Sequence, residues 1–373
     1  MDQDSKVLNI FGELLASVIK RTPLANDRPL RWTIIVNPKA GGFTINRRWK
    51  KHLLSLNSIL QSVSGIPERY DVLPSDTGKR EGGDFGLIAT KDRGHAGEIA
   101  TAVIDDALNY NESVKPFNLL ITAGGDGTSL EVLSGLYEAR AGLGNDFAVL
   151  RLPMGTGNDG ADAWELNDAL TRLTKPVTIE RRRVLSLTTS TPGKGPFLAF
   201  NILSAGLDAF VTHMTNKMKG KLPGDSYKLW VDLAALFYDR VYKVGPMEVN
   251  ATGENGEPAA SFNENVLLLA VGESGRRTYG SHKWILPDDR NVCYLRQMSL
   301  WRKLALKEMF NTGTHIDKPE ATLFNAKRVE FSCVNPILAQ MDGETVLLEK
   351  EDFPAVIELS EPEIPILKPI PEL

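Results

Sequence analysis

The stretch "LLITAGGDGTSLEVL", residues 119–133, combines a hydrophobic segment, three glycines around one acid, and a helical pattern. Glycine lets a backbone turn sharply and approach a ligand closely. The acid, Asp126, would repel a phosphate group unless a metal ion lay between the carboxylate and the phosphate. The stretch therefore predicts a strand, a turn and a helix, with a metal-bridged phosphate as the ligand that explains the acid.

Two further glycine-bearing turns follow predicted strands, namely "NPKAGG" (37–42) after "RWTIIV" and "GTGND" (155–159) after "AVLRLP". Strands that alternate with helices indicate a mostly parallel sheet with helices on both faces. In such a sheet, ligands bind outside the carboxyl ends of the strands, where bare N–H groups and helix N-termini hold anions. Three turns at one edge predict a polyphosphate site, with hydroxyls from Thr128 and Thr156 and with Mg²⁺ at Asp126.

The pattern changes after about residue 178, where short strands with turn signals replace the alternation and only two helices are expected, near 226–241 and 301–310. We predict a helical extension and linker at 1–30, with its helix at 7–19. An α/β nucleotide-binding domain follows at 31–178. A β-rich sandwich domain follows at 179–373, and its C-terminal segment can return to the first domain. Residues 75–85, "SDTGKREGGDF", have no periodic pattern and are expected to form a loop.

Composition excludes several classes of protein. The 373 residues carry a net charge of −4, so no general basic field indicates nucleic-acid binding. The two cysteines, Cys293 and Cys333, form neither a disulfide framework nor a zinc pattern. No secretory signal opens the chain, and no apolar run approaches the ~20 residues of a spanning helix. We expect a cytoplasmic protein, peripheral at a membrane at most.

Two other nucleotide-binding motifs do not account for the sequence. A P-loop is excluded, because G-x-x-x-x-G-K-[ST] does not occur in the sequence. "GTGNDG" (155–160) matches the dinucleotide pattern G-x-G-x-x-G, with Glu180 about 20 residues further on. Against a dinucleotide site, Pro153 and Met154 separate the strand from the glycines, and the turn does not follow the first strand. That interpretation also leaves residues 119–133 unexplained.

The ordered motifs together resemble the diacylglycerol kinase catalytic-domain family, which includes bacterial diacylglycerol kinases, sphingosine kinases and ceramide kinases. The resemblance implies an α/β nucleotide-binding domain, a β-sandwich domain and an active site in the cleft between them. The segments that carry it are "VNPKAGG" (36–42), "TKDRGHAGEIA" (90–100), "GGDGTSLEV" (124–132), "LPMGTGND" (152–159), "NILSAGLDA" (201–209), "LPDDRNVCYL" (286–295) and "QMDGE" (340–344).

The same resemblance assigns roles to individual residues, with ATP and Mg²⁺ as cofactors. Glu344 would be the general base that takes the proton from a lipid hydroxyl, with Asp342 beside it. Asp126 would organise magnesium at the phosphates, and Asp289 would lie in a structural metal site. The residues implied to contact ATP are Asn37, Thr90, Gly124, Gly125, Asp126, Gly127, Thr128, Gly155 and Thr156.

The sequence departs from the family pattern at three places. Leu130 replaces an asparagine that the family often has, and Tyr279-Gly280-Ser281 is a reduced form of a glycine cluster. Arg290 follows Asp289 where the family reads Asp-Gly, which puts the structural metal site in doubt. Leu130 and Arg290 leave open a lipid- or nucleotide-binding regulator without turnover.

The main expectation is an ATP- and Mg²⁺-dependent lipid kinase that acts on a diacylglycerol-like or sphingoid lipid taken from a membrane surface. Because GGDGT turns also resemble those of NAD kinases and phosphofructokinases, a soluble acceptor stays open. The helix at 7–19 is expected to pack on the body or on a second subunit of a homodimer, or to lie in the membrane interface. A loop that suits an anionic membrane, or is simply solvated, contains Met214, Lys217, Met218, Lys219, Lys221, Leu222 and Trp230.

Overall fold

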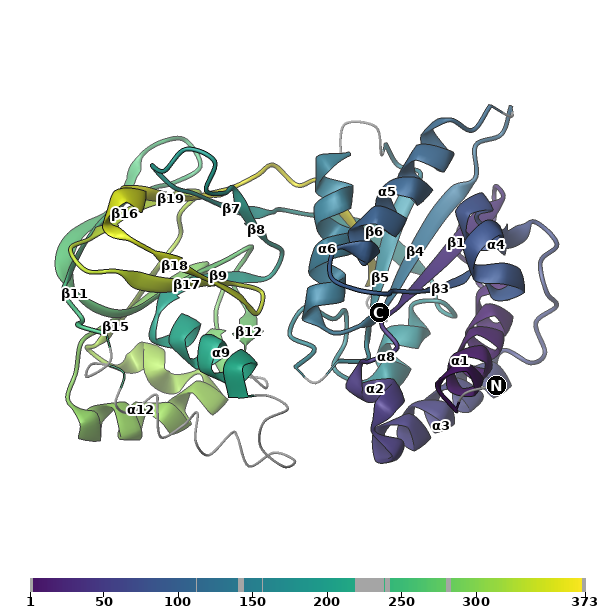
Figure 1. The fold of residues 1–373 in the computed structure, drawn as a ribbon, viewed down its shortest axis with the longest axis horizontal. Coiled ribbons are helices and arrows are strands. Elements are labelled where there is room, and N and C mark those ends of the chain that lie inside the picture. Colours follow the sequence, from purple (N-terminus) through teal and green to yellow (C-terminus); the bar gives the residue numbers. More distant parts are fainter. Residues whose placement is uncertain are drawn as a thin grey trace. The chain divides into compact units, whose positions relative to one another are not determined.

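The computed structural model describes residues 3–111, 113–139, 144–155, 157–218, 238, 242–279 and 283–370. The chain forms two compact units (Figure 1). The first unit comprises Met1–Arg182 together with Pro362–Leu373, and the second comprises Arg183–Glu361. The C-terminal strand therefore belongs to the first unit.

Within the described residues, the first unit contains a seven-stranded sheet in the order β2-β1-β4-β5-β20-β6, with β3 also paired to β1. Strands β1 to β5 pair in parallel, and β20 is parallel to β5 but antiparallel to β6. The predicted mostly parallel α/β sheet is confirmed. The strands are β1 (Leu30–Val36), β2 (Val72–Pro74), β3 (Leu87–Ala89), β4 (Phe117–Gly124), β5 (Phe147–Pro153), β6 (Val177–Arg182) and β20 (Ile364–Pro369).

Helices cover this sheet because alternate strand residues must be buried on each face. On one face, Trp32 and Ile34 of β1 share a fully buried cluster with Phe11 and Leu15 of α1 and Leu56 of α3. The apolar face of α1 therefore packs on the body of the first unit. The helices are α1 (Gln3–Ile19), α2 (Gly41–Thr44), α3 (Asn46–Ser62), α4 (Asp76–Gly82), α5 (His95–Leu108), α6 (Asp126–Glu138) and α8 (Leu166–Thr171).

The expectation of a loop at 75–85 is wrong, because helix α4 and a 3₁₀ turn, Gly83–Phe85, occupy this segment. The Ser75 hydroxyl oxygen accepts a hydrogen bond from the Gly78 N–H at 2.9 Å, which caps the helix N-terminus. Asp76 adds a negative charge in the first turn, where it favours the helix. Capping rather than hydrophobic periodicity thus determines the structure of this short segment.

The second unit is β-rich, as predicted. Within its described residues, eleven strands form an antiparallel sheet system, and long strand β11 pairs with β10 in its first half and with β9 and β14 in its second. The strands are β7 (Leu185–Thr188), β8 (Phe197–Ala199), β9 (Ile202–Gly206), β10 (Pro246–Thr252), β11 (Pro258–Gly272), β14 (Val292–Arg296), β15 (Ala321–Phe324), β16 (Arg328–Cys333), β17 (Ile337–Met341), β18 (Glu344–Leu348) and β19 (Ala355–Leu359).

A separate hairpin joins β12 (Arg277–Tyr279) to β13 (Lys283–Leu286). Among the described residues of this unit, two longer helices accompany the strands, α9 (Leu207–Met218) and α12 (Leu300–Thr312), and the latter confirms the helix expected near 301–310. Most of the helix expected at 226–241 lies outside the described residues. No helix in the described parts of the chain has the length and apolar character needed to cross a membrane.

Candidate active site

The register of the parallel strands aligns the beginnings of the predicted phosphate turns. Val36 at the end of β1 pairs with Ala89 of β3 and with Ala123 of β4, and Ala123 pairs with Leu152 of β5. The carboxyl ends of these four strands are therefore level at one edge of the sheet. We call residues 37–42, 124–128, 153–155 and 157–160 at this edge the phosphate rim.

Direct hydrogen bonds hold the three turns of the phosphate rim together. The Asn37 N–H donates to the Ala123 carbonyl at 3.0 Å, and its side-chain Nδ2 donates to Thr128 Oγ1 at 3.5 Å. The Gly42 N–H donates to the Met154 carbonyl at 2.8 Å. The first turn is thus bonded to both of the others, and the buried Thr128 hydroxyl takes part in this link.

Glycine is required in the rim for close approach. A Cβ atom on Gly155 would lie 2.6 Å from Gly125 Cα, and a Cβ atom on Gly42 would lie 2.9 Å from the Met154 carbonyl oxygen. Neither glycine has a positive φ, so backbone handedness is not the reason for these residues. The turns pack backbone against backbone, which glycine permits because it has no Cβ atom.

Asp126 begins helix α6 and connects the second turn to the third. Its carboxylate accepts a hydrogen bond from the Gly160 N–H at 2.9 Å. Burial raises the pKa of Asp126 above its ordinary value, while the N–H groups of Gly160 and Asn158 and the charge of Arg151 oppose that rise. A nearby cation stabilises the charged form of a carboxylate that has lost its water in this way.

The carboxylates beside the third turn fit a magnesium ion that arrives with a nucleotide. A Cβ atom on Gly157 would lie 3.0 Å from Asp126 Oδ2 and 3.5 Å from Asp159 Oδ2, so both carboxylates approach this glycine. Mg²⁺ is usually held by one or two carboxylates plus substrate phosphates and waters. The described residues contain no group of three or more acidic, histidine or cysteine side chains placed to hold a metal.

Arg48 of α3 adds a positive charge to the rim, which the sequence reasoning missed. Its Nη1 donates to the Gly155 carbonyl at 3.2 Å, and its side chain forms no ion pair and no other hydrogen bond within the described parts of the chain. Burial, Lys51 and Arg48 together lower the pKa of His52 to about 4, despite an opposing effect of Glu165. The run of basic residues that follows the first turn is the sequence signal that could have identified Arg48.

Glu131 is a second residue that the sequence reasoning missed. Its carboxylate oxygens accept hydrogen bonds from the Gly94 N–H at 2.8 Å and the Ala96 N–H at 3.2 Å. It therefore caps the N-terminus of α5 from helix α6. Thr90 precedes this segment and donates its N–H to the Val36 carbonyl at 2.8 Å, so its main chain lies at the rim edge. Thr156, also expected to contact ATP, lies outside the described residues.

In the second unit, the "DGE" motif forms a tight hairpin between β17 and β18. Met341 pairs with Glu344, and the two residues between them, Asp342 and Gly343, have φ values of 46° and 99°. Two-residue hairpin loops with positive φ at both positions favour Asp-Gly. We call residues 341–344 the acidic hairpin. Half-buried Glu344 is the first residue of β18.

Asp342 holds the acidic hairpin in place through main-chain contacts. Its Oδ1 accepts hydrogen bonds from the Asn201 N–H at 3.1 Å and the Ile202 N–H at 2.9 Å, and its Oδ2 accepts one from Phe200. A carboxylate bound by three backbone amides is an anchor for the β8–β9 connection. Its contacts therefore assign Asp342 a positioning role, and its predicted place beside the general base stays a prediction.

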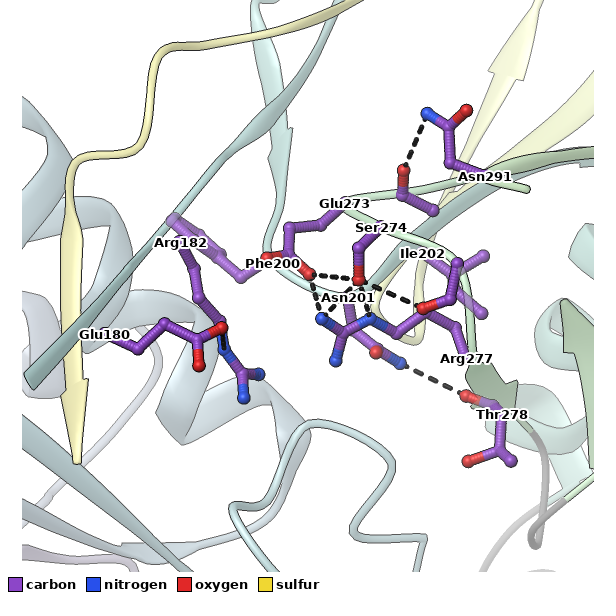
Figure 2. Close-up of polar contacts among 12 residues, drawn as sticks. Glu180, Arg182, Phe200, Asn201, Ile202, Glu273, Ser274, Arg277, Thr278 and Asn291 are labelled. Atoms are coloured by element: carbon purple, nitrogen blue, oxygen red, sulfur yellow. Dashed lines mark hydrogen bonds and ion pairs between the residues drawn. The ribbon is translucent and has the colours of Figure 1, made fainter. Parts of the chain in front are cut away.

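The contacts of Asn201 extend from this anchor to residues 273–278 (Figure 2). Its Nδ2 donates to the Thr278 carbonyl at 3.2 Å, and its carbonyl accepts the Glu273 N–H at 3.0 Å. Figure 2 shows Glu273, Ser274 and Arg277 pointing toward one another, and Arg277 forms an ion pair with buried Glu273. Three motifs of the second unit that are distant in sequence are therefore bonded into one cluster.

The residues around Asp289 do not fit the structural magnesium site that the resemblance implied. Exposed Asp289 forms an ion pair with Arg276 at 2.6 Å, and this hydrogen bond lowers the pKa of Asp289. Asp288 is bound by Arg290, whose Nε lies 3.0 Å from Oδ2. Arginines hold both carboxylates, and Arg290 is the residue that departs from the family pattern.

The loop proposed for the membrane is only partly described. Met214, Lys217 and Met218 belong to α9, whereas Lys219, Lys221, Leu222 and Trp230 lie outside the described residues. The predicted ATP contacts belong to the first unit, and the predicted base, Glu344, belongs to the second.

Comparison with known proteins supports the motif assignment. Residues 75–189 match the family model of the diacylglycerol kinase catalytic domain, which confirms the resemblance to that family. The matched region includes Thr90 and the second and third rim turns, but neither Asn37 nor the acidic hairpin. A search of curated proteins gives no match.

Solved structures with the same fold include three from Bacillus anthracis str. Sterne. One, provisionally named a diacylglycerol kinase, has 19% identity and a TM-score of 0.58 over 92% of this chain and 97% of its own. A second with that provisional name has 19% identity and a TM-score of 0.55 over 90% and 96%. A third, titled a diacylglycerol kinase, has 16% identity and a TM-score of 0.51 over 90% and 96%.

Proposed function

We propose that this protein is an ATP- and Mg²⁺-dependent lipid kinase that phosphorylates a hydroxyl group of a diacylglycerol-like or sphingoid lipid. The observation that carries the proposal is the convergence of three glycine turns at the phosphate rim. The match of residues 75–189 to the diacylglycerol kinase catalytic domain supports a lipid acceptor over a soluble one.

The rim supplies the two properties that phosphoryl transfer needs from a donor site, which are positioning and charge neutralisation. The first N–H groups of α6, from Asp126 onward, have no partners within the helix and form the positive end of its dipole. Arg48 adds a guanidinium charge beside Gly155. Mg²⁺ held by Asp126 and Asp159 would neutralise phosphate charge when the nucleotide is bound.

Proton transfer is assigned to Glu344. The oxygen of the lipid hydroxyl forms a bond to the γ-phosphorus, its proton passes to the Glu344 carboxylate, and the bond from the γ-phosphorus to the bridging oxygen breaks to release ADP. Asp342 keeps the hairpin in place through its contacts with the β8–β9 connection. Phosphoryl transfer needs no covalent intermediate with the protein.

The test of the proposal is transfer of radiolabel from [γ-³²P]ATP, with Mg²⁺, to mixed micelles of diacylglycerol, sphingosine or ceramide, with NAD as a soluble acceptor in parallel. We expect label in the lipid extract of at least one micelle. Label on NAD alone would support a soluble acceptor. Nucleotide binding without any transfer would support a regulator, and either result would contradict the proposal.

The Asp126→Asn variant tests the assigned rim chemistry in the same assay. We expect transfer to fall roughly 10²-fold, because loss of one preorganised electrostatic contact to the reacting phosphates has an effect of that order. The matched control is Asp105→Asn, which neutralises an exposed carboxylate on α5. Equal activity of both variants would show that Asp126 does not serve the phosphates.

A further inference from the structure

Asp208 of α9 is a buried carboxylate to which the proposed reaction assigns no role. It is 3% exposed, and its Oδ2 accepts hydrogen bonds from Ser204 Oγ at 2.5 Å and Gln340 Nε2 at 3.1 Å. Its Oδ1 is buried and has no hydrogen-bond partner within the described residues. Burial of a carboxyl group with an unpaired oxygen is unfavourable, which indicates a role beyond packing.

The side chain of Gln340 connects Asp208 to the acidic hairpin. Its Nε2 donates to both Asp208 and Ser204 Oγ, the latter at 3.1 Å, and its Oε1 accepts the Gly343 N–H at 3.0 Å. An amide has a donor end and an acceptor end, so the partners of one end determine what the other end presents. Because Asp208 and Ser204 offer acceptors, the carbonyl end of Gln340 faces Gly343.

Two other residues of α9 contact the same hairpin. Asn216 Nδ2 donates to the Gly343 carbonyl at 2.8 Å, and His213 Nδ1 lies 3.3 Å from Thr345 Oγ1. The main chain of Gly343 is therefore held at both its N–H and its carbonyl, and Thr345 is held on the other side. Glu344 lies between these two residues, so their contacts place its main chain.

We propose that Asp208 is a positioning residue for Glu344, acting through Gln340 to hold the Gly343 main chain in the one orientation that aims the Glu344 carboxylate. The inference rests on the proposed function only for the role of Glu344. Without the carboxylate, the Gln340 NH₂ group loses one of its two acceptors, so the amide is held less firmly and the Gly343 N–H can lose its carbonyl partner. A shift of about 1 Å in a catalytic group costs about 10² in rate.

Three variants and one control test the inference kinetically. Asp208→Leu removes the acceptor, Asp208→Asn keeps a carbonyl acceptor for Ser204 and Gln340, and Gln340→Met removes the connecting amide. We expect Asp208→Leu and Gln340→Met to lower kcat about 10²-fold per folded molecule, with the KM for ATP within about twofold. Asp208→Asn should recover at least about tenfold of that loss. The control is Asp352→Asn, at a buried carboxylate that pairs with Lys194.

Non-additivity gives a second kinetic criterion. In the double variant Asp208→Leu/Gln340→Met, the two losses should not multiply, because both substitutions break the same connection. Equal reductions of kcat and kcat/KM together with an unchanged KM would agree with loss of positioning. A kcat that is unchanged in folded Gln340→Met, or fully multiplicative losses, would overturn the inference.

Hydrogen exchange of the Gly343 amide, in protein labelled with [¹⁵N]glycine, provides a readout that does not depend on activity. We expect exchange at least about tenfold faster in Asp208→Leu and Gln340→Met than in wild type, and unchanged exchange in Asp352→Asn. If wild type transfers no phosphate to any lipid, the proposed function fails, while this exchange still decides whether Asp208 controls the hairpin. Unchanged Gly343 exchange in both variants would overturn the inference by itself.

Discussion

The phosphate rim of the first unit and the acidic hairpin of the second hold their candidate residues by different means. The rim is built from main chain, through level strand ends and glycine contacts such as that of Gly155 with Gly125. The hairpin is held by side chains, through Asp342, Gln340 and Asn216. An added atom should therefore disturb the packing of the rim, whereas loss of a polar side chain should disturb the placement of the hairpin.

The largest effect is expected for Glu344→Gln in the hairpin. Loss of a general base lowers turnover by about 10² to 10⁴. Nucleotide affinity should be unchanged, because Glu344 is not part of the rim. Radiolabel transfer and nucleotide titration measure the two quantities separately. The control is Glu358→Gln, at an exposed carboxylate on β19, and a Glu344→Gln enzyme with wild-type turnover would refute the assignment.

A second prediction concerns pH, because the pairing of Asp208 is incomplete. Burial raises the pKa of Asp208 to about 6 from 3.8, against the opposing effects of Ser204, Gln340 and Lys283. The folded state therefore keeps this proton after the unfolded state has lost it, so wild-type stability falls as pH rises from about 4 to about 6. The total loss is about 3 kcal/mol.

Asp208→Asn, which does not titrate, should lack that part of the pH dependence. Denaturant unfolding of wild type and Asp208→Asn between pH 4 and pH 8 measures the pH dependence of stability. The free energy of unfolding of wild type relative to the variant should decline across pH 4 to 6 and stay level above. A difference that is constant over the whole range would mean that the Asp208 pKa is not raised.

A smaller effect is expected for Gly155→Ala in the rim. Its methyl group would meet Gly125 Cα at 2.6 Å, so the second and third turns must separate. Overpacking of this kind costs about 1 to 3 kcal/mol, and we expect it to appear as weaker binding of Mg²⁺–ATP. Gly65→Ala is the matched control, since a Cβ atom there meets nothing within 4 Å. Equal affinities of the two variants would show that the close contact is not needed for binding.

The smallest effect is expected for Arg48→Gln, which removes the charge beside Gly155. Affinity for ATP and for inorganic tripolyphosphate should fall about tenfold, the value of one charge-assisted hydrogen bond, while affinity for adenosine stays the same. Arg47→Gln is the control, because it removes an exposed charge one position earlier on the same helix. Calorimetry measures the affinity for each of the three ligands. Similar losses of affinity in both variants would indicate a general effect of positive charge and not a contact between Arg48 and the phosphates.

Sequence reasoning succeeded where local pattern determines structure. The strand, glycine turn and helix at 119–133 became β4, the second rim turn and α6, and the parallel sheet follows from repetition of that unit. Parallel register then aligns Val36 with Ala123, the residues directly before Asn37 and Gly124, although the two are far apart in sequence. The rim could therefore be inferred from strand ends alone, without knowledge of any side-chain contact.

The same reasoning missed features that depend on distant partners or on single caps. Asp208 and Gln340 are separated by 132 positions, and neither has a local pattern that predicts their contact. Arg48 looked like one of several surface cations, and only its contact with Gly155 distinguishes it. The segment 75–85 is helical because Ser75 caps it, which periodicity does not detect.

The central claim is that the phosphate rim binds a metal-bound triphosphate, and hydrogen–deuterium exchange of the wild-type protein tests it most directly. We predict that Mg²⁺–ATP slows exchange in peptides that cover 37–42, 124–130 and 153–160, and that adenosine does not. Unchanged exchange in all three peptides at saturating Mg²⁺–ATP, with protection elsewhere in the chain, would contradict the claim.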